Sequence, residues 1–267
     1  MEDFCYWSIG DGPYGYMLQT LVASFRHVGM EEEFIAFSDR PIEGATTRYI
    51  QDFDHTCNLF KFHFIQQLKD LPYRYFVFVD SDCFFVRKPP DLSQLIADAP
   101  LHVFFEGNCA HPPDPCRRPK WWGCPLNEYV KMMRDCGVTS ENIYNVNAGF
   151  FIVKREAIET VCGLVWDFWK YTLGLGYAFT EEPPLAYAAH MLCENPEAHL
   201  LDHHLDIWAS DWTYQFATRL PEGNPWLFKD WLGFDTHIVN PAIVHLIKSK
   251  PLLVEWAKMN EKHLVKG

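Results

Sequence analysis

The sequence has little positive charge and no long apolar run. Among 267 residues, 23 Lys and Arg stand against 35 Asp and Glu, so the formal net charge is -12 at pH 7. Nucleic acid binding depends largely on Lys and Arg that neutralise phosphates, and we therefore expect no nucleic acid partner. No apolar run reaches the roughly 18 to 20 residues that a membrane-spanning helix needs. We expect no transmembrane segment, and peripheral membrane contact is left open.

The start of the sequence lacks an export signal, and the cysteines lack a disulfide pattern. The segment MEDFCYWSIG has none of the basic, apolar and small-residue zones of a secretion signal. The 9 Cys are odd in number and scattered, which favours reduced thiols over a disulfide framework. Both absences predict a cytoplasmic location. These patterns leave the oligomeric state open.

The sequence is rich in apolar and aromatic side chains. Apolar residues make up 48% of the chain and aromatic residues 16%, which predicts a globular protein with a full core. Because we find no internal repeat and no linker, we expect a single domain over residues 1–267. A stretch rich in Pro and Cys at 108–125 is interpreted as a loop or insertion, since the fold pattern resumes after it.

Strand-like and helix-like segments alternate in the first part of the chain. Apolar runs at 4–9, 33–37 and 75–79 predict strands, and helical spacing at 18–25 and 60–68 predicts helices between them. This alternation favours an α/β protein with a mostly parallel sheet and helices on both faces. Ligands of such sheets bind beyond the carboxyl ends of the strands. Downstream, the sequence predicts strands at 101–105 and 149–153 and helices at 158–169, 181–192 and 252–264.

Two carboxylates follow the strand predicted at 75–79. Asp80 and Asp82 flank Ser81 directly after this apolar run. If the chain turns sharply at Ser81, both carboxylates face one divalent cation, since Mg2+ and Mn2+ are bound by carboxylates together with substrate phosphates. Such a cation would neutralise the charge on a leaving diphosphate. Two solvated Asp at a strand end would give the same pattern without a metal.

Four short segments occur in an informative order. Residues 80–82, 145–151, 180–183 and 245–251 read DSD, NVNAGFF, TEEP and HLIKSKP. Their order and context resemble nucleotide-diphospho-sugar transferases of the GT-A fold, and above all those of the family 8 type. The resemblance extends from residue 4 to residue 251. It implies a GT-A (Rossmann-like) α/β domain with a mixed, mostly parallel sheet flanked by helices.

The resemblance also implies an activity. The chain would be a metal-dependent glycosyltransferase that moves a sugar from a nucleotide-diphospho-sugar, such as a UDP-sugar, to a hydroxyl of a glycan or another acceptor. Asp80, Asp82 and His245 would bind Mn2+ or Mg2+, and Asp80 and Ser81 would also contact the donor. An imidazole suits Mn2+ as a third ligand. A packed or surface His245 is the alternative.

The resemblance assigns two basic residues near the C-terminus to the donor phosphates. These are Lys248 and Lys250. The family has Gly where Lys248 stands, and its Lys-Pro pair comes one residue later than Lys250-Pro251. Lys61 would add a further positive charge near the diphosphate, which helps the leaving group depart. A solvated Lys61 is the alternative.

Two further groups of residues are assigned to the nucleotide and the sugar. Tyr6, Trp7, Ser8 and Gly10 match the first strand and loop that hold the nucleotide base, although the aromatic rings also fit a core. Asn147, Glu181 and Glu182 match the segments against the transferred sugar, where the family has Asp-Gln in place of Glu-Glu. A carboxylate there could attack the anomeric carbon, stabilise an oxocarbenium-like transition state or accept a proton. The resemblance favours the first two, and with them retention of configuration. The acids also fit a helix start.

The stretch 108–125 contains two other features. Cys109, His111, Cys116 and Cys124 have the side chains of a Zn2+ site but lack paired C-x-x-C spacing, so we expect no zinc. Trp121-Trp122 would offer flat faces to a sugar ring on the acceptor side, and ordinary packing would explain the pair equally well.

Two alternative functions compete with glycosyl transfer. A phosphatase of the haloacid dehalogenase type also has D-x-D after an apolar strand, but it favours Thr or Val where this chain has Phe84, and its motif usually opens the fold. The other alternative is a protein that binds a nucleotide sugar without catalysis, which the Glu181-Glu182 departure leaves open.

Overall fold

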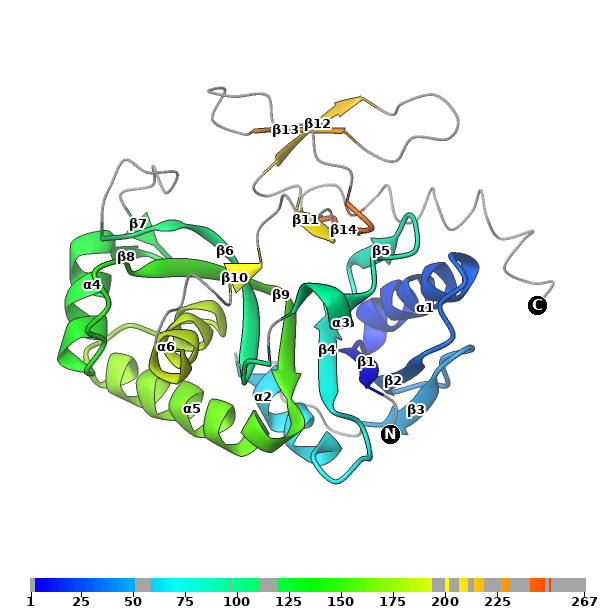
Figure 1. Cartoon of the computed structure of the whole chain (residues 1–267), viewed down its shortest axis with the longest axis horizontal. Helices are drawn as coiled ribbons and strands as arrows, with labels where there is room; N and C mark the ends of the chain where they lie inside the picture. The colour runs from blue at the N-terminus through cyan, green and yellow to red at the C-terminus, as the bar shows by residue number, and fades with distance from the viewer. Residues whose placement is uncertain are drawn as a thin grey trace. The chain divides into compact units, whose positions relative to one another are not determined.

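The computed structural model describes ten segments of the chain (Figure 1). They are residues 3–50, 59–96, 98–110, 120–193, 200–201, 207–210, 214–218, 227–230, 241–247 and 250. The chain divides into two compact units: unit 1 comprises 1–3, 53–77 and 93–202, and unit 2 comprises 4–52, 78–92 and 203–267. The boundary passes through strand β4 (Tyr75–Val79) and the short helix α3 (Leu92–Leu95). Whether residues 1–267 form a single domain stays a prediction.

Unit 2 contains the first strands of the chain and the helix between them. Its strands are β1 (Phe4–Ile9), β2 (Glu33–Ser38), β3 (Thr46–Tyr49), β5 (Cys83–Phe85), β11 (Trp208–Ser210), β12 (Tyr214–Thr218), β13 (Leu227–Asp230) and β14 (Ile243–His245), and its helix is α1 (Gly12–His27). The strand order is β4-β1-β2-β3, and the last two residues of β4 belong to this unit. Strands β1 and β2 are parallel, with Cys5 opposite Glu33, and β2 and β3 are parallel as well.

Apolar periodicity explains how these elements pack. Leu18, Leu21, Val22 and Phe25 recur at helical spacing and are all fully buried on α1. Helix α1 lies alongside β1 and β2 (Figure 1), and it ends near Gly29, which has a φ of +80°. The strands predicted at 4–9 and 33–37 and the helix predicted at 18–25 are thereby confirmed.

A second, smaller sheet in unit 2 joins distant parts of the sequence. Its strand order is β11-β14-β5. Strand β14 runs parallel to β11 and antiparallel to β5, and the register places His245 opposite Cys83. Separately, β12 and β13 pair as an antiparallel ribbon. This small sheet was not predicted from the sequence.

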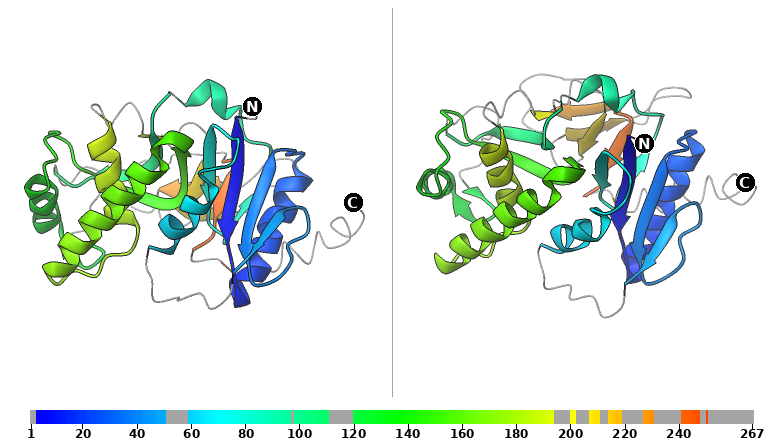
Figure 2. Two further views of the ribbon diagram at one scale, coloured as in Figure 1. Left: turned by 90° about the horizontal axis from the view of Figure 1, so that it is seen from below. Right: turned by 60° about the horizontal axis from the view of Figure 1, so that its bottom comes forward.

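Unit 1 contains most of the helices in the described part of the chain. Its elements are α2 (Phe60–Ile65), the 3-10 helix η1 (Gln66–Leu68), β6 (Leu101–Asn108), β7 (Lys120–Trp121), β8 (Cys124–Pro125), α4 (Leu126–Asp135), β9 (Tyr144–Lys154), the 3-10 helix η2 (Arg155–Ala157), α5 (Ile158–Gly174), α6 (Glu182–Leu192) and β10 (Leu200–Leu201). The strand order is β10-β6-β9-β4, with β10 parallel and β9 antiparallel to β6. Helix α5 packs against α6, which in turn packs on β9 (Figure 2).

The predicted fold class is confirmed, and several boundaries are corrected. Three of the four pairings β1–β2, β2–β3, β10–β6 and β6–β9 are parallel, so the sheet is mixed and mostly parallel and is flanked by helices. The strand predicted at 149–153 begins earlier, because β9 covers Tyr144–Lys154. Within the stretch 108–125, which we interpreted as a loop or insertion, the described residues 120–125 contain the hairpin β7–β8. The helix predicted at 252–264 lies outside the described residues.

None of the described helices combines the length and the apolarity that crossing a membrane requires. Seven cysteines are described, all as free thiols, and all but Cys136 are buried.

Candidate active site

Asp80, Ser81 and Asp82 form a tight turn between β4 and β5. The amide of Cys83 donates a 2.9 Å hydrogen bond to the carbonyl of Asp80, which closes a four-residue turn around Ser81. This is the sharp turn that the sequence hypothesis required. The Asp82 carboxylate is largely buried, and the Asp80 side chain is 24% exposed. Both carboxylates therefore follow the carboxyl end of a buried strand.

His245 reaches these carboxylates because β14 pairs with β5. Its Nε2 atom lies 2.9 Å from Oδ1 of Asp82 and 3.7 Å from Oδ2 of Asp80. The amide of Leu246 also donates a 3.1 Å hydrogen bond to the carbonyl of Asp82, which fixes the end of β14 beside the turn. The imidazole is 4% exposed and packs against Trp208 of β11. The structure thus brings together all three residues that the resemblance assigned to the metal.

The distances from His245 to each of the two Asp side chains fit a shared divalent cation. Two ligand atoms that each lie about 2.1 Å from an octahedral ion are about 3 Å apart when adjacent and about 4.2 Å apart when opposite. The separations of 2.9 and 3.7 Å fall at or between these values. Among the described residues, the group whose ligand atoms all lie within 4.8 Å of one another is Asp82, Cys83 and His245, and Asp80 is not part of it. Mg2+ and Mn2+ prefer the carboxylates, whereas a thiolate would suit a softer ion.

Lys250 adds a positive charge at the edge of this cluster. Its Nζ atom lies 2.9 Å from Oδ2 of Asp82 and 5.3 Å from the centre of the Tyr14 ring. Burial raises the pKa of Asp82, but His245 and Lys250 outweigh burial and hold that pKa well below its usual value. Burial lowers the pKa of Lys250, and Asp82 more than offsets this and raises it. The cluster therefore favours an ionised Asp82 carboxylate next to positively charged groups. Lys248 lies outside the described residues.

The residues assigned to the nucleotide base lie mainly in the core of unit 2. Tyr6, Trp7 and Ser8 on β1 are at most 2% exposed. A Cβ atom added at Gly10 would lie 2.5 Å from the carbonyl oxygen of Tyr14, so the close approach of the chain there requires Gly. The aromatic rings thus serve the core, as one interpretation of the sequence allowed. Their contact with a nucleotide stays a prediction.

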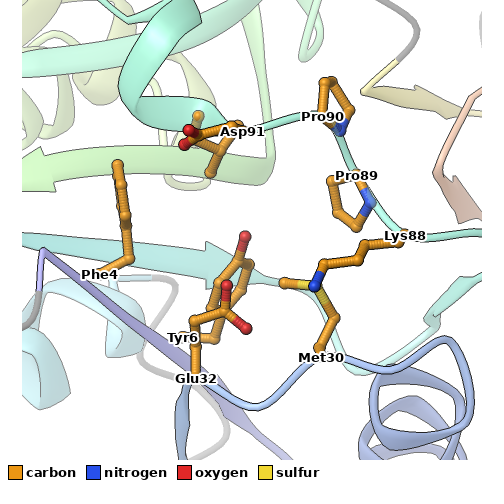
Figure 3. Close-up of a pocket in the computed structure, with 9 residues that line it drawn as sticks. Phe4, Tyr6, Met30, Glu32, Lys88, Pro89, Pro90 and Asp91 are labelled. Carbon is orange, nitrogen blue, oxygen red and sulfur yellow. The ribbon is translucent and has the colours of Figure 1, made fainter.

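Tyr6 also lines a cavity of about 230 Å³ in unit 2 (Figure 3). Its ring packs against Phe25 and Phe85, and its hydroxyl points toward the cavity. Burial and the nearby acids Glu32 and Asp91 raise the pKa of the Tyr6 hydroxyl, which therefore stays protonated.

A second cluster of site residues, in unit 1, is built around buried Lys61. This residue of α2 is 2% exposed, so the alternative of a solvated Lys61 is wrong. Its Nζ atom lies 2.7 Å from Oε1 of Glu181 and donates a 3.0 Å hydrogen bond to the carbonyl of Ala148. Because a buried ammonium is costly unless it is paired, Glu181 and Ala148 stabilise Lys61 in its charged form.

Glu181 and Glu182 begin helix α6. The carbonyl of Glu181 accepts a 2.9 Å hydrogen bond from the amide of Leu185, and prolines follow in the first turn, as expected for a helix start. The Glu182 carboxylate accepts a 2.6 Å hydrogen bond from Nε1 of Trp122, and its other oxygen lies 3.4 Å from the donating amide of Ala148. The helix start and a site role are therefore compatible, because the two side chains have different partners.

An irregularity in β9 explains how Ala148 bonds to both Lys61 and Glu182. Val103 and Phe104 are consecutive on β6, yet they lie opposite Phe151 and Asn147 on β9. The extra residues of β9 leave the regular ladder, so the amide and carbonyl of Ala148 can bond to side chains. The side chain of Asn147 accepts a 2.8 Å hydrogen bond from the amide of Gly149 and is 3% exposed. Asn147 thus shapes this bulge, and its contact with a sugar stays a prediction.

Sequence reasoning missed part of these clusters. Tyr14 was not singled out, although an aromatic residue after the first predicted strand was a usable signal. Trp122 was paired with Trp121 in the sequence hypothesis, but the two differ: Trp121 is 5% exposed, whereas Trp122 is 50% exposed. Of the residues considered for zinc, Cys109 and Cys124 are buried, and His111 and Cys116 lie outside the described residues.

Comparison with solved structures identifies a fold likeness over nearly the whole chain. The galactosyltransferase LgtC, solved in complex with donor and acceptor sugar analogs, matches with a TM-score of 0.56 and 12% sequence identity, over 95% of each chain. At such low identity the likeness shows the fold alone, and it confirms the GT-A fold that the sequence resembles. The protein-family models and curated proteins that were compared give no match.

Proposed function

We propose that this chain is a metal-dependent glycosyltransferase that moves a sugar from a nucleotide-diphospho-sugar to a hydroxyl of an acceptor. The observation that carries the proposal is the approach of His245 to Asp80 and Asp82, within 3.7 and 2.9 Å, at the end of a strand of this fold. Asp82 is largely buried and both carboxylates approach a buried imidazole, which two solvated Asp at a strand end would not do.

The three residues would hold Mn2+ or Mg2+, which neutralises charge on the leaving diphosphate when it is bound. Lys250 is suited to bind a donor phosphate, because its ammonium already pairs with Asp82 and can exchange this partner for a phosphate oxygen. Asp80 keeps part of its surface open to a ligand. UDP is the nucleotide that we propose for the donor.

The cluster around Lys61 would serve the transferred sugar with retention of configuration. Glu181 is paired with a buried ammonium, and this geometry suits electrostatic stabilisation of an oxocarbenium-like transition state. Glu182, bound by neutral N–H donors, keeps acceptor capacity for a sugar hydroxyl. Asn147 would hold the bulge of β9 in place for both acids.

The proposal is tested by release of nucleoside diphosphate. Purified protein is incubated with UDP-glucose, UDP-galactose and UDP-N-acetylglucosamine, each with Mn2+, Mg2+ or EDTA, and free UDP is measured. We expect release with metal, none with EDTA, and a loss of at least about a hundredfold in Asp82→Asn, because even the outer-shell partners of a metal account for about 10- to 100-fold. The exposed Asp70 provides a matched control in Asp70→Asn, which keeps full activity.

Other outcomes lead to different conclusions. Metal-dependent binding of a UDP-sugar without release would indicate a non-catalytic binding protein. Release of inorganic phosphate from simple phosphomonoesters, abolished in Asp80→Asn, would instead favour the phosphatase. Neither binding nor release with any of the three donors would refute a role with UDP-sugars.

A further inference from the structure

Trp122 occupies a backbone position that is unfavourable for a bulky residue. The hairpin β7–β8 pairs Trp121 with Cys124, so Trp122 and Gly123 are the two central residues of its turn. Their φ angles are +49° and +78°, as in a type I′ turn. Gly, Asn and Asp adopt these angles readily, whereas a large aromatic residue does so at an energetic cost. Such strain often marks a functional residue.

The Trp122 indole is held in place and remains half open to solvent. Its Nε1 atom donates a 2.6 Å hydrogen bond to Oε2 of Glu182 on α6, and the acceptor is ionised, which strengthens the bond. The side chain of Trp122 is nevertheless 50% exposed. The indole ring of Trp122 is thus held at its N–H edge by Glu182, and about half of its surface is accessible to a ligand.

The neighbouring Trp121 anchors the hairpin. It is 5% exposed and packs edge to face against Tyr129 of α4, with ring centres 4.9 Å apart. Trp121 therefore packs the hairpin against α4 through its ring.

We propose that Trp122 is a stacking platform for a pyranose ring and that Glu182 positions it. A pyranose has an apolar C–H face that packs on an aromatic ring and hydroxyl groups at its edge that donate hydrogen bonds. The Glu182 carboxylate at the edge of Trp122 can accept such bonds. The same negative charge repels phosphates, which disfavours a nucleotide at this ring. The proposal rests on the proposed function, because it names a sugar subsite for the cluster around Lys61.

The platform is tested by fluorine NMR on protein labelled with 5-fluorotryptophan. The chain contains 10 Trp, and the signal of residue 122 is identified by its loss in Trp122→Asn. Asn suits the φ of +49° and so removes the ring without strain in the turn. The probes are methyl α- and β-glucoside, methyl α- and β-galactoside, lactose, maltose, UDP-glucose, UDP-galactose and UDP.

We expect the signal of residue 122 to shift in a saturable manner with saccharides and to be unaffected by UDP. A shift with free glycosides indicates an acceptor ring, whereas a shift only with UDP-sugars indicates the donor sugar, and either result supports the platform. The platform would be overturned if no saccharide changes the chemical shift of residue 122, or if UDP alone changes it as much as a UDP-sugar does. If UDP is released but the chemical shift of residue 122 does not change with saccharides, the platform alone is rejected. If the chemical shift changes but no UDP is released, the proposed function alone is rejected.

Three variants test positioning by Glu182. Glu182→Ala should broaden or split the signal of residue 122 and weaken saccharide binding by about tenfold, the equivalent of one modest contact. Glu182→Gln should restore both, because its amide oxygen can still accept the Trp122 N–H bond. Tyr49→Ala removes another exposed ring, 65% exposed on β3, and should leave saccharide binding unchanged. Equal binding in Glu182→Ala and the wild type contradicts the positioning role.

Discussion

At the scale of single residues, the ion pair between Lys61 and Glu181 has a structural role that must be separated from catalysis. Lys61 is 2% exposed, so removal of Glu181 leaves a buried ammonium with the Ala148 carbonyl as a remaining partner. Breaking a buried pair in this way typically costs more than the pair itself contributes. Loss of activity in a Glu181 variant would therefore be ambiguous unless stability is measured as well.

We predict that Glu181→Ala lowers the free energy of unfolding by roughly 3 kcal/mol, because the buried charge loses its compensation. Urea denaturation followed by circular dichroism measures this loss. In the double variant Lys61→Met with Glu181→Leu, much of the stability should return, since no unpaired charge is left. If Glu181→Ala is as stable as the wild type, the pair is not a stabilising feature of unit 1.

At the scale of elements, His190 links α6 to β9 as a neutral imidazole. Its Nε2 atom accepts a 3.0 Å hydrogen bond from the amide of Tyr144, and the two rings stack with centres 6.0 Å apart. Burial, aided by the charge of Arg134, lowers the pKa of His190 from 6.5 to about 4. An accepting Nε2 must be unprotonated, so geometry and pKa agree.

We predict that acidification weakens the contact between α6 and β9. Between pH 6.5 and 4 the unfolded chain binds a proton at His190 that the folded chain does not, so stability falls as pH falls through this range. The loss amounts to at most roughly 3 kcal/mol for this one group. Urea midpoints at several pH values should fall less steeply for His190→Gln, whose amide oxygen can accept the Tyr144 bond without titrating. Parallel slopes would contradict the prediction.

Elements also show where sequence reasoning succeeds and where it ends. The apolar runs of β1, β2 and β4 and the stripe on α1 were predicted because burial imposes a period on a single segment. The bulge at Ala148 was not predicted, because it depends on the register between β6 and β9. The pairing of β14 with β5, which delivers His245, likewise depends on residues far apart in the chain. The resemblance named His245 as a ligand, but the sequence alone could not give its distance to Asp82.

At the scale of the whole molecule, the predicted α/β class with a mixed, mostly parallel sheet is confirmed, and the likeness to LgtC confirms the GT-A fold. Alternation of strands and helices was sufficient to predict the α/β class, because parallel pairing requires crossovers, whereas the GT-A fold was predicted from the resemblance. The division into two units was not predicted. Each unit is built from three separate ranges of the sequence. The boundary between the units is therefore crossed several times along the chain, and no single linker or change in composition marks it.

We predict that Mn2+ raises the melting temperature of the whole chain. The residues proposed as its ligands follow β4 and end β14, so a bound ion would join segments that separate on unfolding. At a metal concentration about 100 times the Kd, the gain is about 2.7 kcal/mol, which corresponds to a rise of roughly 5 °C or more for a chain of this size. Differential scanning fluorimetry with increasing Mn2+ measures the rise. EDTA should reverse it and His245→Ala should abolish it, while Asp70→Asn should behave as the wild type. A rise of the same size in His245→Ala would show that Mn2+ binds elsewhere and that the proposed ligand set is wrong.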